Sequence, residues 1–284
     1  MWKQKLCLGI GPQFGLSMQE IMEMVQKAGF DAVFTQWRKG DASLQWAKQA
    51  ADMGLIYQSI HAPWGRSADM WHGTEEKALA GVEELTDCLR TCADAQVPIM
   101  VAHAFVGFND HNPTQAGIDC FGQVVAEAEK LGVKIAFENT EGEEYLAALM
   151  HAFAGSKFTG FCWDTGHEMC YNHSQDLLAL YGDQLICTHI NDNLGIRDFH
   201  GEITFIDDLH LLPFDGIADW CSIAARLDGC GYRDIMTFEL STRSKPGRHE
   251  NDCYARMPVP EYIAEAYKRA CRVAALRRLN MIGE

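Results

Sequence analysis

Eight short runs of apolar residues recur along the chain, and a stretch with helical periodicity follows each of them. Runs of this length are typical of strands in a parallel sheet, because helices cover both faces of such a sheet. The predicted strands are residues 6–11, 32–37, 57–63, 99–104, 134–140, 158–164, 185–192 and 235–240.

Two of the intervening stretches carry clear helix signals. Residues 17–30 begin with Ser17, three positions before Glu20, which is the spacing of a capping box. Residues 75–95 repeat their apolar positions with the period of an amphipathic helix. Regular alternation of strands and helices predicts a parallel sheet with right-handed crossovers.

The number of strand–helix repeats indicates whether the sheet closes into a barrel or stays open. Eight strand–helix units are the number at which a parallel sheet closes into a (β/α)8 barrel, or TIM barrel. An open doubly wound sheet is the alternative, but no GxGxxG motif follows the first strand. No linker rich in Pro, Gly or Ser divides the chain. We therefore predict an α/β fold with a single (β/α)8 barrel domain over residues 1–284.

Composition and charge narrow the expected partners and location. The formal net charge of −15 argues against nucleic acid, because phosphate binding relies on clustered Lys and Arg. The short apolar run at the N-terminus and the lack of a membrane-length apolar stretch predict a cytoplasmic protein with no membrane partner. Eleven cysteines without a CxxC pair are expected to be reduced thiols. We expect a small-molecule substrate and leave a homo-oligomer open.

Polar residues stand where the predicted strands end. In the stretch FCWDTGHEMC, Asp164 and His167 follow a buried run, which alone also fits an Asp that caps the next helix and a hydrogen-bonded His. The feature recurs at six consecutive strands, whose ends share one face of a barrel. We therefore predict a metal site there. The residues at the strand ends are His61, His103, Glu138, Asp164, His189 with Asp192, and Glu239.

Alternation along the strands predicts what lies beneath this site. Side chains two positions apart point to the same face of a strand. The residues two positions before the polar ends are all small or medium-sized, and we expect them to form a compact layer inside the barrel. They are Ser59, Val101, Ala136, Cys162, Cys187 and Thr237.

Three carboxylates and one imidazole, from Glu138, Asp164, His189 and Glu239, suit a hard to borderline divalent ion. We expect one such ion, Mn²⁺ first, with Zn²⁺, Co²⁺ or Mg²⁺ as alternatives. A bound ion polarises a substrate oxygen and acidifies the neighbouring C–H group. Glu138 and Glu239 would be the catalytic pair, one removing a proton and the other returning it. This chemistry predicts isomerisation or epimerisation through an enediolate.

The motifs AFENT, WDTGH, THINDN, DLHLLPFDG and TFEL together resemble those of the xylose isomerase-like TIM-barrel superfamily, and the resemblance covers nearly the whole chain. This superfamily includes sugar isomerases and epimerases, inosose-processing enzymes and the zinc-dependent apurinic endonucleases related to endonuclease IV. The resemblance to the epimerase branch implies that the four ligands bind one metal, that the two glutamates are its acid/base pair, and that His167 contacts substrate oxygens.

The endonuclease branch offers a different use of the same face. Its three-zinc site has further histidines at the positions of His61 and His103, and an Asp-x-His pair that matches Asp208 and His210. The ligand set alone does not exclude a multinuclear site. The acidic charge and the lack of an evident basic loop set favour a sugar-type substrate. On that basis the substrate-binding residues are His61, His103, His167, Asp208, His210 and Trp64.

We predict a metal-dependent sugar or polyol isomerase or epimerase. The alternatives are a dehydratase of a cyclic polyol, a zinc phosphodiester hydrolase, and a barrel that binds a sugar without converting it; paired catalytic glutamates argue against the last. Trp37 and Trp163 are further candidates for stacking on a sugar ring, or else they pack the barrel rim. The basic loop of residues 241–250 either holds a substrate phosphate or carboxylate, or is simply solvated.

Overall fold

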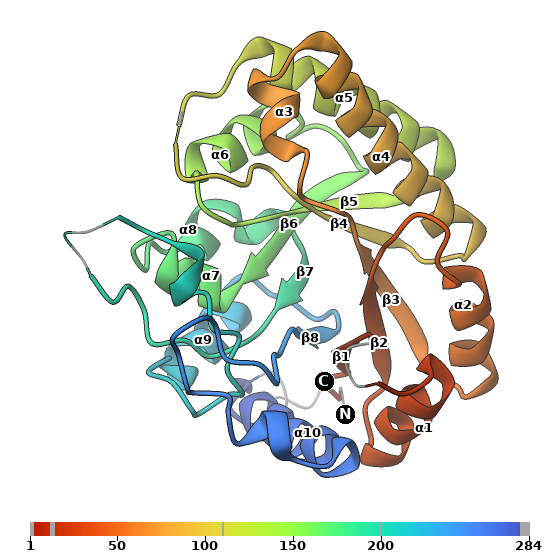
Figure 1. Ribbon diagram of the computed structural model, residues 1–284, viewed down its shortest axis with the longest axis vertical. Helices are drawn as coiled ribbons and strands as arrows, with labels where there is room; N and C mark the ends of the chain where they lie inside the picture. The colour runs from red at the N-terminus through yellow and green to blue at the C-terminus, as the bar shows by residue number, and fades with distance from the viewer. Residues whose placement is uncertain (1–2, 12–14, 110, 199, 201, 279–284) are drawn as a thin grey trace.

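The computed structural model of the protein describes residues 3–11, 15–109, 111–198, 200 and 202–278. All eight predicted strands form, and they join in one parallel sheet of order β7-β6-β5-β4-β3-β2-β1-β8. The sheet curls into a nearly closed barrel (Figure 1), so the predicted (β/α)8 fold is confirmed. The strands are β1 (Leu6–Ile10), β2 (Ala32–Gln36), β3 (Ile56–His61), β4 (Ile99–His103), β5 (Lys134–Glu138), β6 (Thr159–Asp164), β7 (Leu185–His189) and β8 (Met236–Phe238).

Helices surround the strands, and most of them lie between one strand and the next in the chain (Figure 1). The predicted capping box at Ser17 is confirmed, because its side chain accepts from the Glu20 N–H and the Glu20 carboxylate accepts from the Ser17 N–H. The helices are α1 (Met18–Ala28), α2 (Ser43–Asp52), α3 (Ser67–His72), α4 (Glu75–Asp94), α5 (Gln115–Leu131), α6 (Glu143–Ala152), α7 (Thr165–Cys170), α8 (Leu177–Tyr181), α9 (Trp220–Gly229) and α10 (Val259–Ala275).

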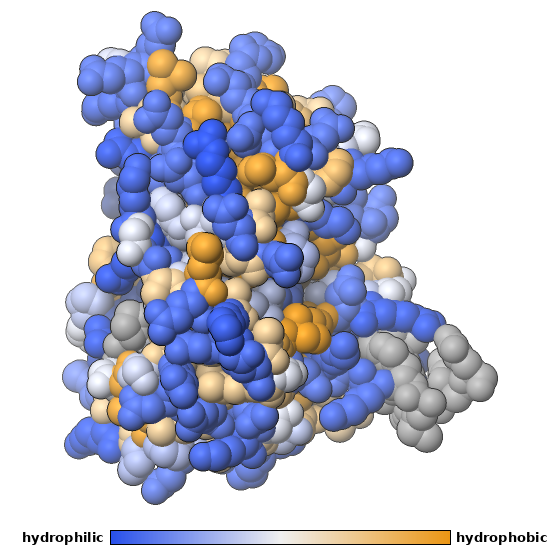
Figure 2. Space-filling view, turned by 90° about the vertical axis from the view of Figure 1, so that its right-hand side faces the viewer, coloured by the Kyte–Doolittle hydropathy of each residue, from blue (hydrophilic) through white to orange (hydrophobic). Residues whose placement is uncertain are grey.

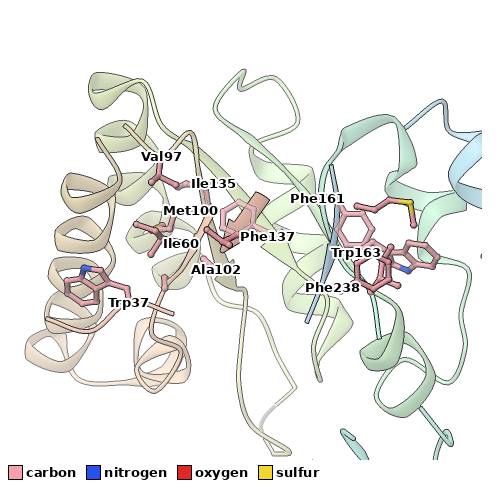
Figure 3. Close-up of a cluster of buried hydrophobic side chains, with 14 of the residues drawn as sticks. Trp37, Ile60, Val97, Met100, Ala102, Ile135, Phe137, Phe161, Trp163 and Phe238 are labelled. Carbon is pink, nitrogen blue, oxygen red and sulfur yellow. The ribbon is translucent and has the colours of Figure 1, made fainter. Parts of the chain in front are cut away.

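The main hydrophobic core lies between the strands and the surrounding helices. Figure 3 shows part of it, with Ile60, Met100 and Ile135 from three neighbouring strands gathered beside the helices. All three side chains are fully buried. Removal of this apolar surface from water is the main force that holds the helices against the barrel.

A separate layer fills the inside of the barrel beneath the strand ends. Val101, Ala136, Cys162 and Cys187 form a buried cluster of their own, as the alternation along the strands predicted. Gln58 joins this layer unexpectedly. The register between β2 and β3 shifts at this point, so Gln58 is an extra residue in β3. Its side chain makes hydrogen bonds with Cys187, Ser59 and Thr237.

The two strands that meet last, β7 and β8, are joined more sparsely than the others. Ile190 and Phe238 form an isolated bridge, in which the Ile190 N–H donates to Thr237 O over 2.7 Å. The Thr237 N–H instead donates to the side-chain hydroxyl of Thr188, at 3.0 Å. We call this junction the β7–β8 seam.

The surface is mostly polar, with apolar residues scattered among polar ones on the face shown in Figure 2. No helix within the described residues combines the length and the apolar character that a membrane crossing requires. All eleven cysteines are free thiols, as expected from their spacing.

Candidate metal centre

The four predicted metal ligands converge at the carboxyl-terminal end of the barrel. One ligand atom from each of Glu138, Asp164, His189 and Glu239 lies within 4.8 Å of the others. Atoms that share one ion at about 2.0–2.6 Å are separated by up to about twice that distance. The four residues therefore have the spacing that a single ion requires.

Glu138 is the central residue of this arrangement, and its side chain is fully buried. Its Oε1 lies 2.8 Å from Nδ1 of His189. Its Oε2 lies 3.0 Å from Nε2 of His61 and 3.2 Å from Nε2 of His103. Burial alone would raise the pKa of Glu138, but the charge of His189 and the hydrogen bonds from the three imidazoles outweigh it and hold the pKa well below its usual range. Glu138 is therefore an ionised carboxylate that joins His189 on one oxygen to His61 and His103 on the other.

Asp164 has a second task besides facing the cluster. Its Oδ1 accepts a hydrogen bond from the His167 N–H at 2.6 Å and thereby caps helix α7. Its Oδ2 accepts from Nδ2 of Asn191 at 2.8 Å. Burial raises the pKa of Asp164 to about 6, although the charges of His167 and His210 act in the opposite direction. Both sequence interpretations of this residue are thus present at once, the helix cap and the site carboxylate.

His189 stands between the two glutamates. Its Nδ1 is 2.8 Å from Glu138 Oε1 and 3.2 Å from Glu239 Oε2. Burial lowers the pKa of His189, but the charges of the two glutamates raise it well above its usual value. Burial raises the pKa of Glu239, but the charge of His189 outweighs burial and lowers this pKa to about 2. Without a metal ion, the positive charge of protonated His189 therefore stabilises the two carboxylates.

The donor set fits a divalent cation. Glu138 and Asp164 are fully buried carboxylates, and such groups are costly unless they are paired or bound to a metal. An oxygen-rich set with one imidazole suits Mn²⁺, Mg²⁺, Co²⁺ or Zn²⁺, and nothing in the geometry selects one of them.

His61 and His103 form a second group of potential ligands around the other oxygen of Glu138. Nδ1 of His61 donates to the Ala62 carbonyl at 2.7 Å, which leaves Nε2 directed at the carboxylate. Nδ1 of His103 is buried and has no hydrogen-bond partner among the described residues. Both were predicted to bind substrate, and both line the cavity described below.

His167, Asp208 and His210 form a third group of potential ligands. Oδ1 of Asp208 lies 3.3 Å from Nε2 of His167 and 2.9 Å from Nε2 of His210. Burial lowers the pKa of His210, but the charge of Asp208 overcomes this effect and raises it to about 9. Oδ2 of the same carboxylate binds Nζ of Lys245 at 2.9 Å. The structure thus brings all of the predicted substrate-binding histidines to one face.

A cavity of about 430 Å³, within the usual range for small-molecule sites, is lined by the histidines of the second and third groups together with Asp208 and Glu239. Its walls combine the imidazoles and carboxylates with the aromatic rings of Trp64, Phe108 and Tyr171. Trp64 is 39% exposed and stacks on His103 with the ring centroids 5.5 Å apart. A second cavity of about 520 Å³ shares Gln36, His210 and Glu239 with the first.

Two other tryptophans proposed for sugar stacking lie elsewhere. Trp37, which follows β2, is buried, and its Nε1 donates to the hydroxyl of Thr91 in helix α4. Trp163 is fully buried and donates to Glu168 beneath the guanidinium of Arg226. They therefore pack the barrel rather than line the cavity.

Asp192 is used within the loop that follows β7, and in the basic loop after β8 Lys245 and Arg243 each line a cavity whereas Arg248 forms ion pairs. The carboxylate of Asp192 accepts from three backbone N–H groups and from Trp220, so it shapes the loop after β7. Arg248 pairs with Asp207 and Glu250. Sequence reasoning missed Asn139 and Asn191, which hold Asp164 in place, although both stand within the quoted motifs.

The sheet forms a nearly closed α/β barrel, and imidazoles and carboxylates gather at the carboxyl ends of its strands. Enzymes with this fold have their active sites at that face, so the class that the fold and the site define is that of the TIM-barrel enzymes. The chain belongs to the family described as xylose isomerase-like TIM barrel, which matches residues 22–271.

Comparison with individual proteins agrees with this assignment. The chain is 27% identical to protein y4fM of Sinorhizobium fredii (strain NBRC 101917 / NGR234), over 88% of this chain and 90% of that protein. Its fold is similar to that of an L-ribulose 3-epimerase (TM-score 0.73, 17% identity, 98% of this chain and 97% of the other). It is also similar to the IolI protein with a bound zinc atom (TM-score 0.75, 19% identity, 96% and 98%). The chain spans 44% of a fusion of a xylose isomerase-like TIM barrel with 4-hydroxyphenylpyruvate dioxygenase (TM-score 0.74, 16% identity, 98% of this chain).

Proposed function

We propose that the protein is a divalent-metal-dependent isomerase or epimerase of a sugar or polyol that works through an enediolate. The observation that carries this proposal is the pair of ionised glutamates, Glu138 and Glu239, whose carboxylates both reach Nδ1 of His189, at 2.8 and 3.2 Å. A carboxylate on each side of a substrate carbon is what proton removal and proton return require. Simple sugar binding needs no such pair.

The metal would be held by Glu138, Asp164, His189 and Glu239, and when bound it would polarise a substrate oxygen so that the adjacent C–H group becomes acidic. The chain's own residues do the rest. Glu239 lines both cavities and has its carboxylate in reach of a substrate there. His61, His103 and His167 line the smaller of these cavities, and Nδ1 of His103, which has no hydrogen-bond partner among the described residues, can hold a sugar hydroxyl group.

The aromatic wall supports a sugar-type ligand. Trp64 lines the cavity with a partly exposed ring that stacks on the imidazole of His103. Sugar rings present apolar C–H faces between polar edges, and an aromatic ring beside hydrogen-bonding groups matches both. An L-ribulose 3-epimerase shares this fold at 17% identity, so the fold can carry an epimerase of the proposed class.

A zinc phosphodiester hydrolase is the second candidate, because the structure places three groups of potential metal ligands side by side. Two observations count against it. The net charge of −15 opposes a polyanionic substrate. The ammonium group of Lys245 already neutralises Asp208 in the third group.

Proton exchange with solvent tests the proposal. We would incubate the metal-loaded protein with candidate ketoses and cyclic polyols in deuterated water and follow the reacting carbon by NMR. We expect deuterium at that carbon of any substrate that turns over, because a carboxylate that takes a proton trades it with water. A product that has lost water would indicate the dehydratase, which shares the enediolate. Turnover without deuterium, or cleavage of abasic DNA with no reaction of any sugar, would refute the proposal.

Replacement of each glutamate separates the two proton transfers. Glu138→Gln and Glu239→Gln keep the shape of the side chain and remove the base, so each should lower kcat by about 10²–10⁴-fold. One of the two variants should still exchange the substrate proton, because the surviving glutamate works on one face. Glu127→Gln, which alters a surface pair with Arg90 and Lys130, is the matched control and should leave kcat unchanged.

A further inference from the structure

The third ligand group is built around one oxygen atom, Oδ1 of Asp208. The Nε2 atoms of His167 and His210 point at it from 3.3 and 2.9 Å, and yet it has no well-formed hydrogen bond from the described residues. The ligand atoms of these three residues lie within 4.8 Å of one another. Atoms at this spacing leave room for a shared ion of ordinary bond length.

The hydrogen bonds of the two histidines prepare them to hold a cation. Nδ1 of His167 lies 2.9 Å from the Asn139 carbonyl, and Nδ1 of His210 lies 3.1 Å from the Glu239 carbonyl. A carbonyl oxygen only accepts, so each Nδ1 carries a hydrogen, and a metal ion that displaces the other ring proton would meet the lone pair of Nε2. Histidines that ligate metals are held by a backbone carbonyl in this way.

A positive charge is nevertheless already present. Nζ of Lys245 lies 2.9 Å from the second oxygen of Asp208. Lys245 is the sole Lys or Arg among the described residues that line the smaller cavity, and its side chain is only 24% exposed. A metal ion on Oδ1 and an ammonium group on Oδ2 of one carboxylate would repel each other at close range.

We propose that Lys245 supplies at this cluster the positive charge that a metal ion would otherwise supply, so that His167, Asp208 and His210 bind a metal only when Lys245 is replaced by a neutral residue. The inference rests on the proposed function and deepens it. A lysine at the third group restricts the protein to metal at the Glu138 centre, which suits proton transfer on a sugar rather than cleavage of a phosphodiester by several ions.

Metal counting tests this inference without any assay of activity. Metal-free protein, prepared with a chelator, would be titrated with Zn²⁺ and with Mn²⁺, and the metal bound per chain would be measured after equilibrium dialysis. Lys245→Met should bind one more ion than the wild-type protein. Removal of a like charge at this range should tighten binding at the cluster by about 100-fold. The double variant Lys245→Met/His210→Gln should return to the wild-type count.

Matched variants separate charge from side-chain loss. Lys245→Arg keeps a cation and should keep the wild-type count. Arg248→Met removes a cation from the same loop and should also leave the count unchanged, because Arg248 pairs with Asp207, which forms no ion pair with a histidine within the described part of the chain. Thermal melting would establish that each variant is folded, and Lys245→Gln would replace Lys245→Met if the latter does not fold.

Two results would overturn the inference. One is an unchanged metal count in the neutral variant of Lys245. The other is the loss of an ion when His210→Gln is made in the wild-type background, because the cluster would then bind metal with the lysine in place. The deuterium experiment reports on the proposed function, whereas the difference between the variant and wild-type counts reports on Lys245 alone.

Discussion

Asp164 shows how much a single side chain contributes at this site. One carboxylate oxygen caps helix α7 and the other is held by Asn191, so the group cannot rotate away from the cluster. Its backbone is fixed as well, because Asn139 both donates to and accepts from it. A ligand that is locked by its surroundings loses little conformational freedom when an ion binds. Asp164 is therefore preorganised for the proposed metal.

The protonation of His189 leads to a prediction about pH. In the metal-free protein Glu138 and Glu239 keep the pKa of His189 well above its usual value, so its ring is charged at pH 7. A metal must take the place of that proton, and binding at pH 7 should release about one proton. Because the pKa of Asp164 is about 6, a further proton competes as the pH falls through this value, and metal affinity should rise steadily from pH 5 to pH 8.

Calorimetric titration in buffers with different ionisation enthalpies would measure the released proton. His249→Gln, which alters an exposed His paired with Asp252, should leave the number unchanged. Metal binding at pH 7 with no proton release would show that His189 is already neutral between the two glutamates.

The sequence predicts those residues of the candidate centre that can be recognised by their position at the end of a strand. Glu138, Asp164 and His189 end their strands, and side chains at that place in a barrel must meet. The partner of a long, flexible side chain depends on loops that no periodicity describes, which is why the contact of Lys245 with Asp208 could not be foreseen. The alternation of side chains along β6 does predict that Trp163 points outward, since its neighbour Asp164 points inward.

At the scale of elements, helix α7 starts directly at the end of β6, and this sharp connection depends on Gly166. A Cβ atom at position 166 would lie 1.9 Å from Oδ1 of Asn191. Asn191 is fully buried and bonds the Asp164 carboxylate, so it cannot move aside without releasing that ligand. The glycine is needed for space here rather than for an unusual backbone angle.

Gly166→Ala should therefore weaken both stability and metal binding. We expect a loss of about 1–3 kcal/mol in the free energy of unfolding, as is typical of overpacking. Displacement of Asn191 should weaken metal affinity by about 10–100-fold. Denaturant unfolding of the metal-free protein and a metal titration would measure the two effects separately.

Gly229→Ala, in helix α9, is the matched control, because a Cβ there meets no atom within 4 Å. Its free energy of unfolding should change by no more than about 1 kcal/mol. Metal binding by Gly166→Ala at wild-type affinity would contradict the positioning role assigned to Asn191.

The elements themselves were predictable because burial on both faces leaves a short apolar run in the sequence. Each predicted strand begins and ends within three residues of the observed one. The extra residue in β3 was not predictable, because Gln58 interrupts the two-residue period without a Gly or Pro to mark the bulge. A polar residue in that position is tolerated because Cys187, Ser59 and Thr237 satisfy its amide.

At the scale of the whole molecule, the proposed ligands come from both sides of the β7–β8 seam. His189 ends β7 and Glu239 follows β8, so an ion bound by both connects the two strands with the sparsest backbone pairing. An ion that binds only the folded state stabilises that state, and here the stabilisation should be concentrated at the β7–β8 seam. Metal loading should therefore change the local dynamics of the barrel unevenly.

Removal of the metal should raise amide hydrogen exchange in residues 185–190 and 236–239 by at least about tenfold, since each 1.4 kcal/mol of local stability is worth a factor of ten. Residues 99–103 and 134–138, in the fully paired strands β4 and β5, serve as the internal control and should exchange as before. Mass spectrometry of the metal-loaded and chelated protein would show the difference. Equal acceleration in all four segments would mean that the ion stabilises the barrel as a whole.

The seam also bears on how the protein behaves when metal is scarce. If β7 and β8 separate, each becomes an edge strand with unpaired N–H and C=O groups, and exposed edges pair readily with other chains. β7 carries the apolar sequence LICTH and has few charges to prevent such pairing. We therefore expect chelated protein to form oligomers through added strands at concentrations where the loaded protein stays monodisperse. The supply of metal would then govern the solubility of the protein as well as its chemistry.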